Sequence, residues 1–104
     1  MKYKSLDIHS IPIIGGHDHS EQQLQLTRVH HVIIATPGRL RDMLDQRMCT
    51  ISQCEYIVMD ECDRMCEMGF EEDLNYILNA IGGKRQTVMF SATMPDVVKN
   101  LSKK

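Results

Sequence analysis

Four short apolar runs, separated by stretches long enough to form helices, constrain the fold of this chain more than any other feature. The run His31–Ala35 carries consecutive Val and Ile residues, a pattern typical of strands covered on both faces in a parallel sheet. Strands that alternate with helices form crossover units. The sequence therefore predicts an α/β fold with an open parallel sheet. Its four expected strands are Ile11–Ile14, His31–Ala35, Tyr56–Met59 and Thr87–Phe90.

Capping residues and helical spacing mark the segments between these runs. Thr36 suits a helix N-cap, and Pro37 suits the first helical position. Gly69 and the pair Gly82-Gly83 bracket a segment with apolar residues along one helical face. The expected helices run from Ser20 to about Thr27, onward from Pro37, from Phe70 to Ile81 and onward from Pro95, while Tyr3 and Leu6 suggest the end of another.

The bulk composition is that of a globular domain or part of one. The chain has 104 residues, 42% of them hydrophobic and 25% charged, with a formal net charge of −2. No overall basic field argues for nucleic acid. The four cysteines lack a C-x-x-C pair, which favours free buried thiols over zinc. No signal peptide and no apolar run near the roughly 18 residues of a membrane span occurs, so we expect a soluble, intracellular protein.

Polar and glycine residues follow each of the four expected strands. In parallel sheets the ligand site lies beyond the carboxyl ends of the strands, so these residues are expected at one edge. A purely structural domain has little reason to collect them there. The four groups are Gly15-Gly16, Thr36–Arg39, Asp60-Glu61 and Ser91–Thr93.

Asp60 and Glu61 offer the chemistry of a nucleotide hydrolase. The carboxylate of Asp60 follows four apolar residues, where it would be costly unless a cation or hydrogen bonds meet it. Mg²⁺ held through water beside nucleotide phosphates would offset that cost. Glu61 could then orient or deprotonate the attacking water. Alternatively, Asp60 caps the next turn and Glu61 is solvated, which is the better interpretation of an isolated Asp-Glu pair.

The start of the helix at Pro37 is a possible anion site. Its backbone N–H groups would face the ligand, Gly38 would allow close approach, and Arg39 would add a charge-assisted contact. An ordinary capped helix explains the same residues when they are taken alone. Ser91 and Thr93 place hydroxyls near the acidic strand end, or serve as a routine cap.

Taken together and in this order, the four groups resemble the first RecA-like domain of the DEAD-box RNA helicases. The resemblance covers about Leu6 to Leu101, and the part from Ile33 to Pro95 looks most like the splicing members. Cys62 stands where the family usually has alanine. The matching elements are the double glycine Gly15-Gly16, motif Ib Thr36-Pro37-Gly38-Arg39-Leu40, motif II (Walker B) Asp60-Glu61-Cys62-Asp63 and motif III Ser91-Ala92-Thr93 with its flank Met94-Pro95.

The resemblance implies ATP and Mg²⁺ as cofactors and RNA as partner. Asp60 would hold Mg²⁺ through water, and Glu61 would position or activate the hydrolytic water. Asp63, Ser91 and Thr93 would link the nucleotide site to the RNA-bound state. The implied contacts to the RNA sugar-phosphate backbone, independent of base sequence, come from Gly15, Gly16, Thr36, Pro37, Gly38 and Arg39.

The chain carries only part of that family's machinery. No Gly-x-x-x-x-Gly-Lys-Ser/Thr loop occurs in it. Residues 1–104 are therefore expected to be the C-terminal portion of RecA-like domain 1, incomplete and without the P-loop strand. The resemblance implies that the P-loop segment lies upstream, and that a second RecA-like domain with an arginine finger lies downstream.

The resemblance implies that the parent protein is an ATP-dependent RNA helicase, which unwinds duplexes or remodels ribonucleoproteins, in the nucleus or, less favoured, the cytoplasm. The isolated chain is expected to hydrolyse no ATP, because it lacks the phosphate cradle. Two alternatives stay open. One is a non-catalytic RNA- or protein-binding module derived from a helicase domain, and the other is a different nucleotide hydrolase of the same superfamily.

Overall fold

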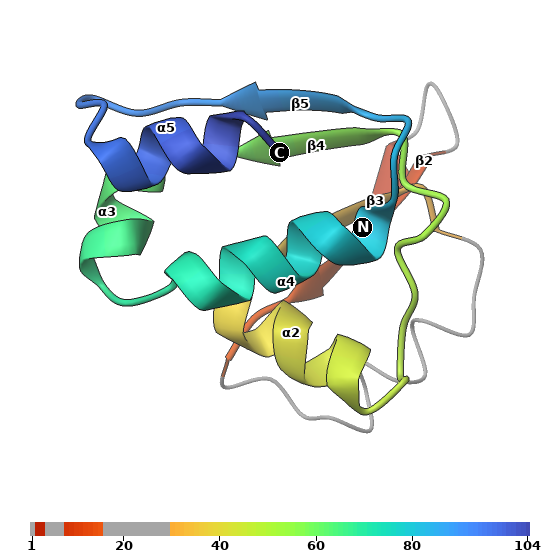
Figure 1. The fold of residues 1–104 in the computed structure, drawn as a ribbon. Coiled ribbons are helices and arrows are strands. Elements are labelled where there is room, and N and C mark those ends of the chain that lie inside the picture. The colour runs from red at the N-terminus through yellow and green to blue at the C-terminus, as the bar shows by residue number, and fades with distance from the viewer. Residues whose placement is uncertain (1, 4–7, 16–29) are drawn as a thin grey trace. The chain divides into compact units, whose positions relative to one another are not determined.

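The computed structural model describes residues 2–3, 8–15 and 30–104 (Figure 1). The chain divides into two compact units, Met1–Cys49 and Thr50–Lys104, each of which contains a pair of parallel strands. No helix in the described ranges has the length and apolar character needed to cross a membrane.

The described residues of the first unit form three strands and one helix. Strand β2 (Ile8–Ile13) pairs in parallel with β3 (Val32–Ala35) and antiparallel with the short β1 (Lys2–Tyr3). Helix α2 (Pro37–Asp45) follows β3 directly and begins at the expected proline. The predicted strands at residues 11–14 and 31–35 are thus confirmed, although β2 begins three residues earlier than expected.

One of the two expectations for helices near the N-terminus is wrong. Tyr3 does not end a helix, as its spacing from Leu6 suggested, but pairs with Ile8 in the β1–β2 ladder. The reason is that the outer edge of β2 offers unpaired backbone groups, and an extended segment can satisfy them. The helix expected from Ser20 to Thr27 lies outside the described residues.

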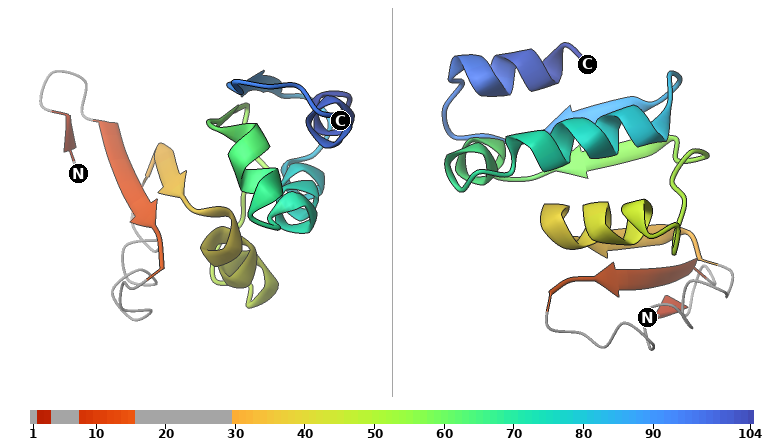
Figure 2. Two further views of the ribbon diagram at one scale, coloured as in Figure 1. Left: turned by 90° about the vertical axis from the view of Figure 1, so that its left-hand side faces the viewer. Right: turned by 60° about the horizontal axis from the view of Figure 1, so that its bottom comes forward.

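The second unit contains one parallel strand pair and three helices. Strand β4 (Tyr56–Met59) pairs with β5 (Gln86–Met89), with Val58 opposite Val88. Three helices complete the unit: α3 (Cys62–Glu67), α4 (Glu71–Ile81) and α5 (Asp96–Ser102). Figures 1 and 2 show α4 and α5 on the same side of the strand pair, and α5 contacts both α3 and α4.

One apolar cluster holds the second unit together. Alternating strand residues face opposite sides of a sheet, so Met59 joins the cluster with Ile57 packed against it, whereas Tyr56 and Val58 on the other face are 54% and 51% exposed. The four apolar residues that precede Asp60 are therefore not all buried. The expectation that the run His31–Ala35 is covered on both faces is also wrong within the described residues, because Val32 and Ile34 of β3 are 42% and 47% exposed. The cluster consists of Met59, Cys62, Leu74, Leu78, Val98 and Leu101.

The boundaries of α4 follow from local chemistry. Three acids in its first turn complement the positive end of the helix. At its end, Gly82 has φ +90°, a conformation that glycine adopts without strain. Arg85 Nη1 then donates a hydrogen bond of 2.8 Å to the Gly82 carbonyl, which has no partner inside the helix. The predicted stop at Gly82-Gly83 is confirmed.

Candidate functional site

Asp60 lies immediately after β4, as the sequence predicted, but its side chain is exposed rather than buried. Its Oδ1 accepts a hydrogen bond of 2.9 Å from the backbone N–H of Glu61. The premise that burial would make this carboxylate costly is therefore wrong, because β4 packs only one of its faces. Among the described residues no group donates to Oδ2, which leaves this oxygen available to a ligand.

Glu61 has a left-handed backbone, with φ 54° and ψ 47°, and occupies the N-cap position of α3. A residue with a Cβ pays about 1–2 kcal/mol for that conformation, so its surroundings must hold it. The next residue, Cys62, has a fully buried side chain, and its N–H donates a 3.0 Å hydrogen bond to the carbonyl of Phe90 at the end of β5. These contacts fix the backbone from which the Glu61 side chain extends.

Asp63 joins the start of α3 to the segment after β5. Its backbone N–H donates to Ser91 Oγ (3.1 Å), and its Oδ2 accepts from both the N–H (3.1 Å) and the hydroxyl (2.9 Å) of Thr93. The Ser91 hydroxyl in turn donates to the Thr93 carbonyl at 2.7 Å. The expected proximity of Ser91 and Thr93 to the acidic strand end is confirmed, and Asp63 is the residue that they meet.

Hydrogen bonds to the Asp63 carboxylate hold its pKa below the ordinary aspartate value, against a smaller opposing effect of burial. The Thr93 hydroxyl contributes most, and the backbone N–H groups of Arg64 and Thr93 add to it. Because the carboxylate form makes the bonds, their contribution to stability is present above the ordinary aspartate pKa. It is lost as pH falls through the lower pKa of the folded state.

Replacing Thr93 with Val should therefore raise the pKa of Asp63 toward its ordinary value. The substitution removes the hydroxyl bond and keeps the backbone one. The pKa can be measured by an NMR titration of the Asp63 carboxyl carbon. Thr87→Val, which alters an exposed hydroxyl in β5, is the matched control. An unchanged Asp63 titration in Thr93→Val would contradict the assignment.

An open hollow lies at this end of the β4–β5 pair. Among the described residues its lining carries four carboxylates and one cationic group, the guanidinium of Arg64. Such a surface suits a hard divalent cation and repels free phosphate. No cluster of three or more metal-ligating side chains occurs in the described ranges, so water or a ligand must complete any coordination here. The lining consists of Asp60, Glu61, Asp63, Arg64, Glu67, Phe90, Ser91 and Ala92.

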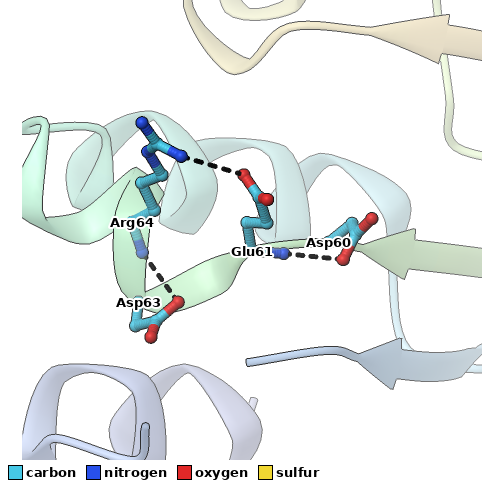
Figure 3. Close-up of polar contacts among 4 residues, drawn as sticks. All are labelled: Asp60, Glu61, Asp63 and Arg64. Atoms are coloured by element: carbon cyan, nitrogen blue, oxygen red, sulfur yellow. Dashed lines mark hydrogen bonds and ion pairs between the residues drawn. The ribbon is translucent and has the colours of Figure 1, made fainter. Parts of the chain in front are cut away.

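The site contains two groups that the sequence reasoning missed. One is Arg64, whose Nη1 lies 4.0 Å from Glu61 Oε2. The i to i+3 spacing of these two residues at the start of a helix is the sequence feature that could have predicted this contact. The Phe90 carbonyl is the other, and no sequence pattern reveals which backbone group a strand end offers. Figure 3 shows the Glu61 and Arg64 side chains on one side of the segment and the Asp63 side chain on the opposite side.

The predicted anion site at the start of α2 belongs to the first unit. Thr36 is the N-cap with extended backbone, but its side chain makes no capping hydrogen bond, and Pro37 follows as expected. The Arg39 side chain is only 14% exposed, and its Nη1 lies 3.8 Å from Asp42 Oδ2. Gly38 is half-buried. An anion bound here would therefore meet a partly buried Arg39 guanidinium and would compete for it with the Asp42 carboxylate.

Of the predicted double glycine, only Gly15 lies within the described residues. It occupies an exposed turn two residues after the end of β2, and a Cβ built on it meets no described atom within 4 Å. Close packing against the described part of the chain therefore does not explain the glycine. Gly16 lies outside the described ranges.

The cysteines are free, but only Cys62 is fully buried; the other three are half-buried. Burial is the main cause that raises the pKa of Cys49, Cys62 and Cys66, so these thiols stay protonated and unreactive near neutral pH. Cys62 instead serves the core of the second unit.

The chain matches known proteins over almost its whole length. The family model described as "DEAD/DEAH box helicase" matches residues 1–101. The pre-mRNA-splicing ATP-dependent RNA helicase prp28 of Schizosaccharomyces pombe is 43% identical over 117 residues, covering 94% of this chain and 18% of that protein. The ATP-dependent RNA helicase abstrakt of Drosophila melanogaster is 46% identical over 97 residues, covering 93% of this chain and 16% of that protein.

Solved structures agree with the sequence matches. The yeast DEAD-box splicing factor Prp28 has a TM-score of 0.86 at 35% identity and covers 95% of this chain, which spans 23% of that one. A hypothetical ATP-dependent RNA helicase from Sulfolobus tokodaii has a TM-score of 0.89 at 32% identity, covering 96% of this chain and 30% of that one. The predicted fold is thus confirmed: the chain is part of an α/β, RecA-like helicase domain with parallel strands.

Proposed function

Because this chain belongs to the DEAD/DEAH box helicase family, we propose that it is part of an ATP-dependent RNA helicase. The parent protein would couple ATP binding and hydrolysis to duplex unwinding or ribonucleoprotein remodelling. One observation carries the proposal: the acidic end of β4 is tied to the segment after β5 through Asp63, Ser91 and Thr93. This link joins two of the family's motifs in space.

The position of the Asp60 carboxylate suits the binding of a magnesium ion through water. Its carboxylate is exposed at the rim of an acidic hollow, and its Oδ2 accepts no hydrogen bond from any residue in the described ranges. When bound, Mg²⁺ would neutralise the charge of the nucleotide phosphates. The negative lining makes that ion necessary, because the four carboxylates would otherwise repel a nucleotide.

Glu61 is the proposed group that orients or deprotonates the attacking water. Its carboxylate is exposed, and its backbone is held by contacts to Asp60 and, through Cys62, to Phe90. Asp63 would pass movement of the Ser91–Thr93 segment to this end of β4. The P-loop and the arginine finger would come from other parts of the natural polypeptide, since this chain contains no phosphate-loop motif.

The first unit would hold the RNA backbone. Support comes from the start of α2, where Thr36 and Pro37 leave the first N–H groups of the helix without intrahelical partners, and from Gly38, which allows a phosphate to approach. Arg39 would supply a charge, and Gly15 and Gly16 would supply the backbone of the turn after β2. Contacts of this kind do not read base sequence.

Replacing Arg39 with Ala should weaken RNA binding by the natural polypeptide about tenfold, through loss of one charge-assisted phosphate contact. The slope of affinity against salt concentration should also fall by about one. Fluorescence anisotropy with a single-stranded RNA at several salt concentrations measures both. Lys99→Ala, which removes an exposed cation from α5, should change neither quantity. Unchanged affinity and slope in Arg39→Ala would remove this residue from the RNA site.

We place the parent protein in the nucleus, as a remodeller of ribonucleoproteins. The support is that prp28, to which this chain is similar, is described as a pre-mRNA-splicing helicase. Abstrakt is described only as an ATP-dependent RNA helicase, so the step in RNA metabolism rests on the first resemblance.

The natural polypeptide that carries this sequence tests the proposal directly. We expect its ATP hydrolysis to rise when RNA is added, and we expect it to separate short duplexes only with ATP. The 104-residue chain alone should hydrolyse none. An absence of both activities in the natural polypeptide, with RNA binding retained, would instead favour a non-catalytic RNA-binding module.

A further inference from the structure

The backbone of Glu61 does not by itself set the direction of its side chain. Its backbone is fixed in the left-handed region, but its side chain is 66% exposed and could otherwise rotate freely in solvent. A carboxylate that acts on a bound water must point in one direction when the water arrives. The backbone contacts alone do not provide that direction.

Arg64 reaches the same carboxylate from one turn further along α3. Its Nη1 lies 4.0 Å from Glu61 Oε2, and both groups face the same side of the segment, away from Asp63 (Figure 3). The lining of the hollow contains no other cationic side chain among the described residues. Arg64 is therefore the residue in a position to restrain Glu61 by charge.

The backbone of Arg64 is itself anchored. Its N–H donates a 2.9 Å hydrogen bond to Asp63 Oδ1, while Asp63 Oδ2 is held by Thr93. Contacts thus run without interruption from the segment after β5, through Asp63 and Arg64, to the Glu61 carboxylate.

We propose that Arg64 is a positioning residue that holds the Glu61 carboxylate in place for the attacking water. The inference rests on the proposed ATP hydrolysis and assigns Arg64 no contact with the nucleotide. Because the guanidinium is 71% exposed, water screens the pair. Its loss should therefore cost only about two- to fivefold in kcat.

The test is a double-mutant cycle in the natural polypeptide, measured by single-turnover ATP hydrolysis with saturating RNA. Arg64→Gln should lower the rate about two- to fivefold and leave the KM for ATP unchanged. Arg64→Lys, which keeps the charge, should restore most of the loss. In a Glu61→Gln background, Arg64→Gln should have no further effect, because the group that it positions is gone.

Lys99→Gln, which removes an exposed cation far along the chain, should leave the rate unchanged. A rate rise in Arg64→Gln, an equal fall in both backgrounds, or a raised KM with normal kcat would each overturn the inference. Glu61→Gln by itself separates the two proposals. Full activity in that variant would refute the proposed role of Glu61, whereas its loss beside a normal Arg64→Gln would refute only the role of Arg64.

Discussion

Replacing Glu61 with Gln should lower RNA-stimulated ATP hydrolysis by the natural polypeptide at least about 10²-fold, the usual contribution of a positioned general base. The amide keeps the size of the side chain but cannot accept a proton from water. Since Asp60 lies at the preceding position and carries the proposed metal contact, nucleotide binding should survive. The measurements are the steady-state rate with RNA and the affinity for a fluorescent ATP analogue.

Glu72→Gln is the matched control for this experiment. Glu72 is an exposed glutamate in the first turn of α4, outside the lining of the hollow, so its neutralisation should leave the rate near that of the unmodified protein. If Glu61→Gln hydrolysed ATP as fast as this control, the proposed water-activating role would be wrong. A fall in affinity without a fall in maximal rate would assign Glu61 to binding instead.

Replacing Met59 with Ala should destabilise the second unit by about 2–5 kcal/mol, the usual cost of truncating a buried Met, Leu or Ile side chain. Met59 is 4% exposed and contributes to the cluster that joins β4 to the three helices. The resulting cavity would be lined by residues of α3, α4 and α5. Since Asp60 is the next residue, a less stable packing of β4 should also lower the rate of ATP hydrolysis.

Met68→Ala is the same chemical change at a position that is 66% exposed, and surface changes of this kind usually stay within about 0.5 kcal/mol. Native-state hydrogen exchange of the natural polypeptide, followed by mass spectrometry in peptides from β4 and α4, reports the opening free energy of this unit. Equal effects of Met59→Ala and Met68→Ala would show that the cluster is not what stabilises it.

The elements were predictable where the local signal was strong. Strand β4 has the predicted bounds, α2 begins at Pro37, and α4 ends at Ile81 before Gly82, because β-branched runs, proline and glycine each act locally on the backbone. Helix α3 was missed, since its six residues are mostly charged or small and show no apolar period. The helix forms because its first residue, Cys62, packs in the core and donates a backbone hydrogen bond to the Phe90 carbonyl.

The candidate site was predictable in its residues but not in its contacts. Motif resemblance named Asp60, Glu61, Asp63, Ser91 and Thr93. Spacing along the chain could not show that Asp63 accepts two hydrogen bonds from Thr93, since the partners are thirty residues apart. That the four expected strands form one sheet also stays a prediction, because the described parallel strands form two separate pairs.

The sequence alone determined the α/β class, the positions of the strand ends and the set of acids, hydroxyls and glycines that follow them. Those features depend on interactions within a few residues, which periodicity, capping and turn chemistry express directly. Tertiary structure alone decided that Asp60 is exposed, that Glu61 is left-handed and that Arg64 faces it. Each of these features depends on which face of β4 the helices cover and on the backbone hydrogen bond from Cys62 to Phe90 after β5. Such long-range packing leaves no local pattern in a sequence.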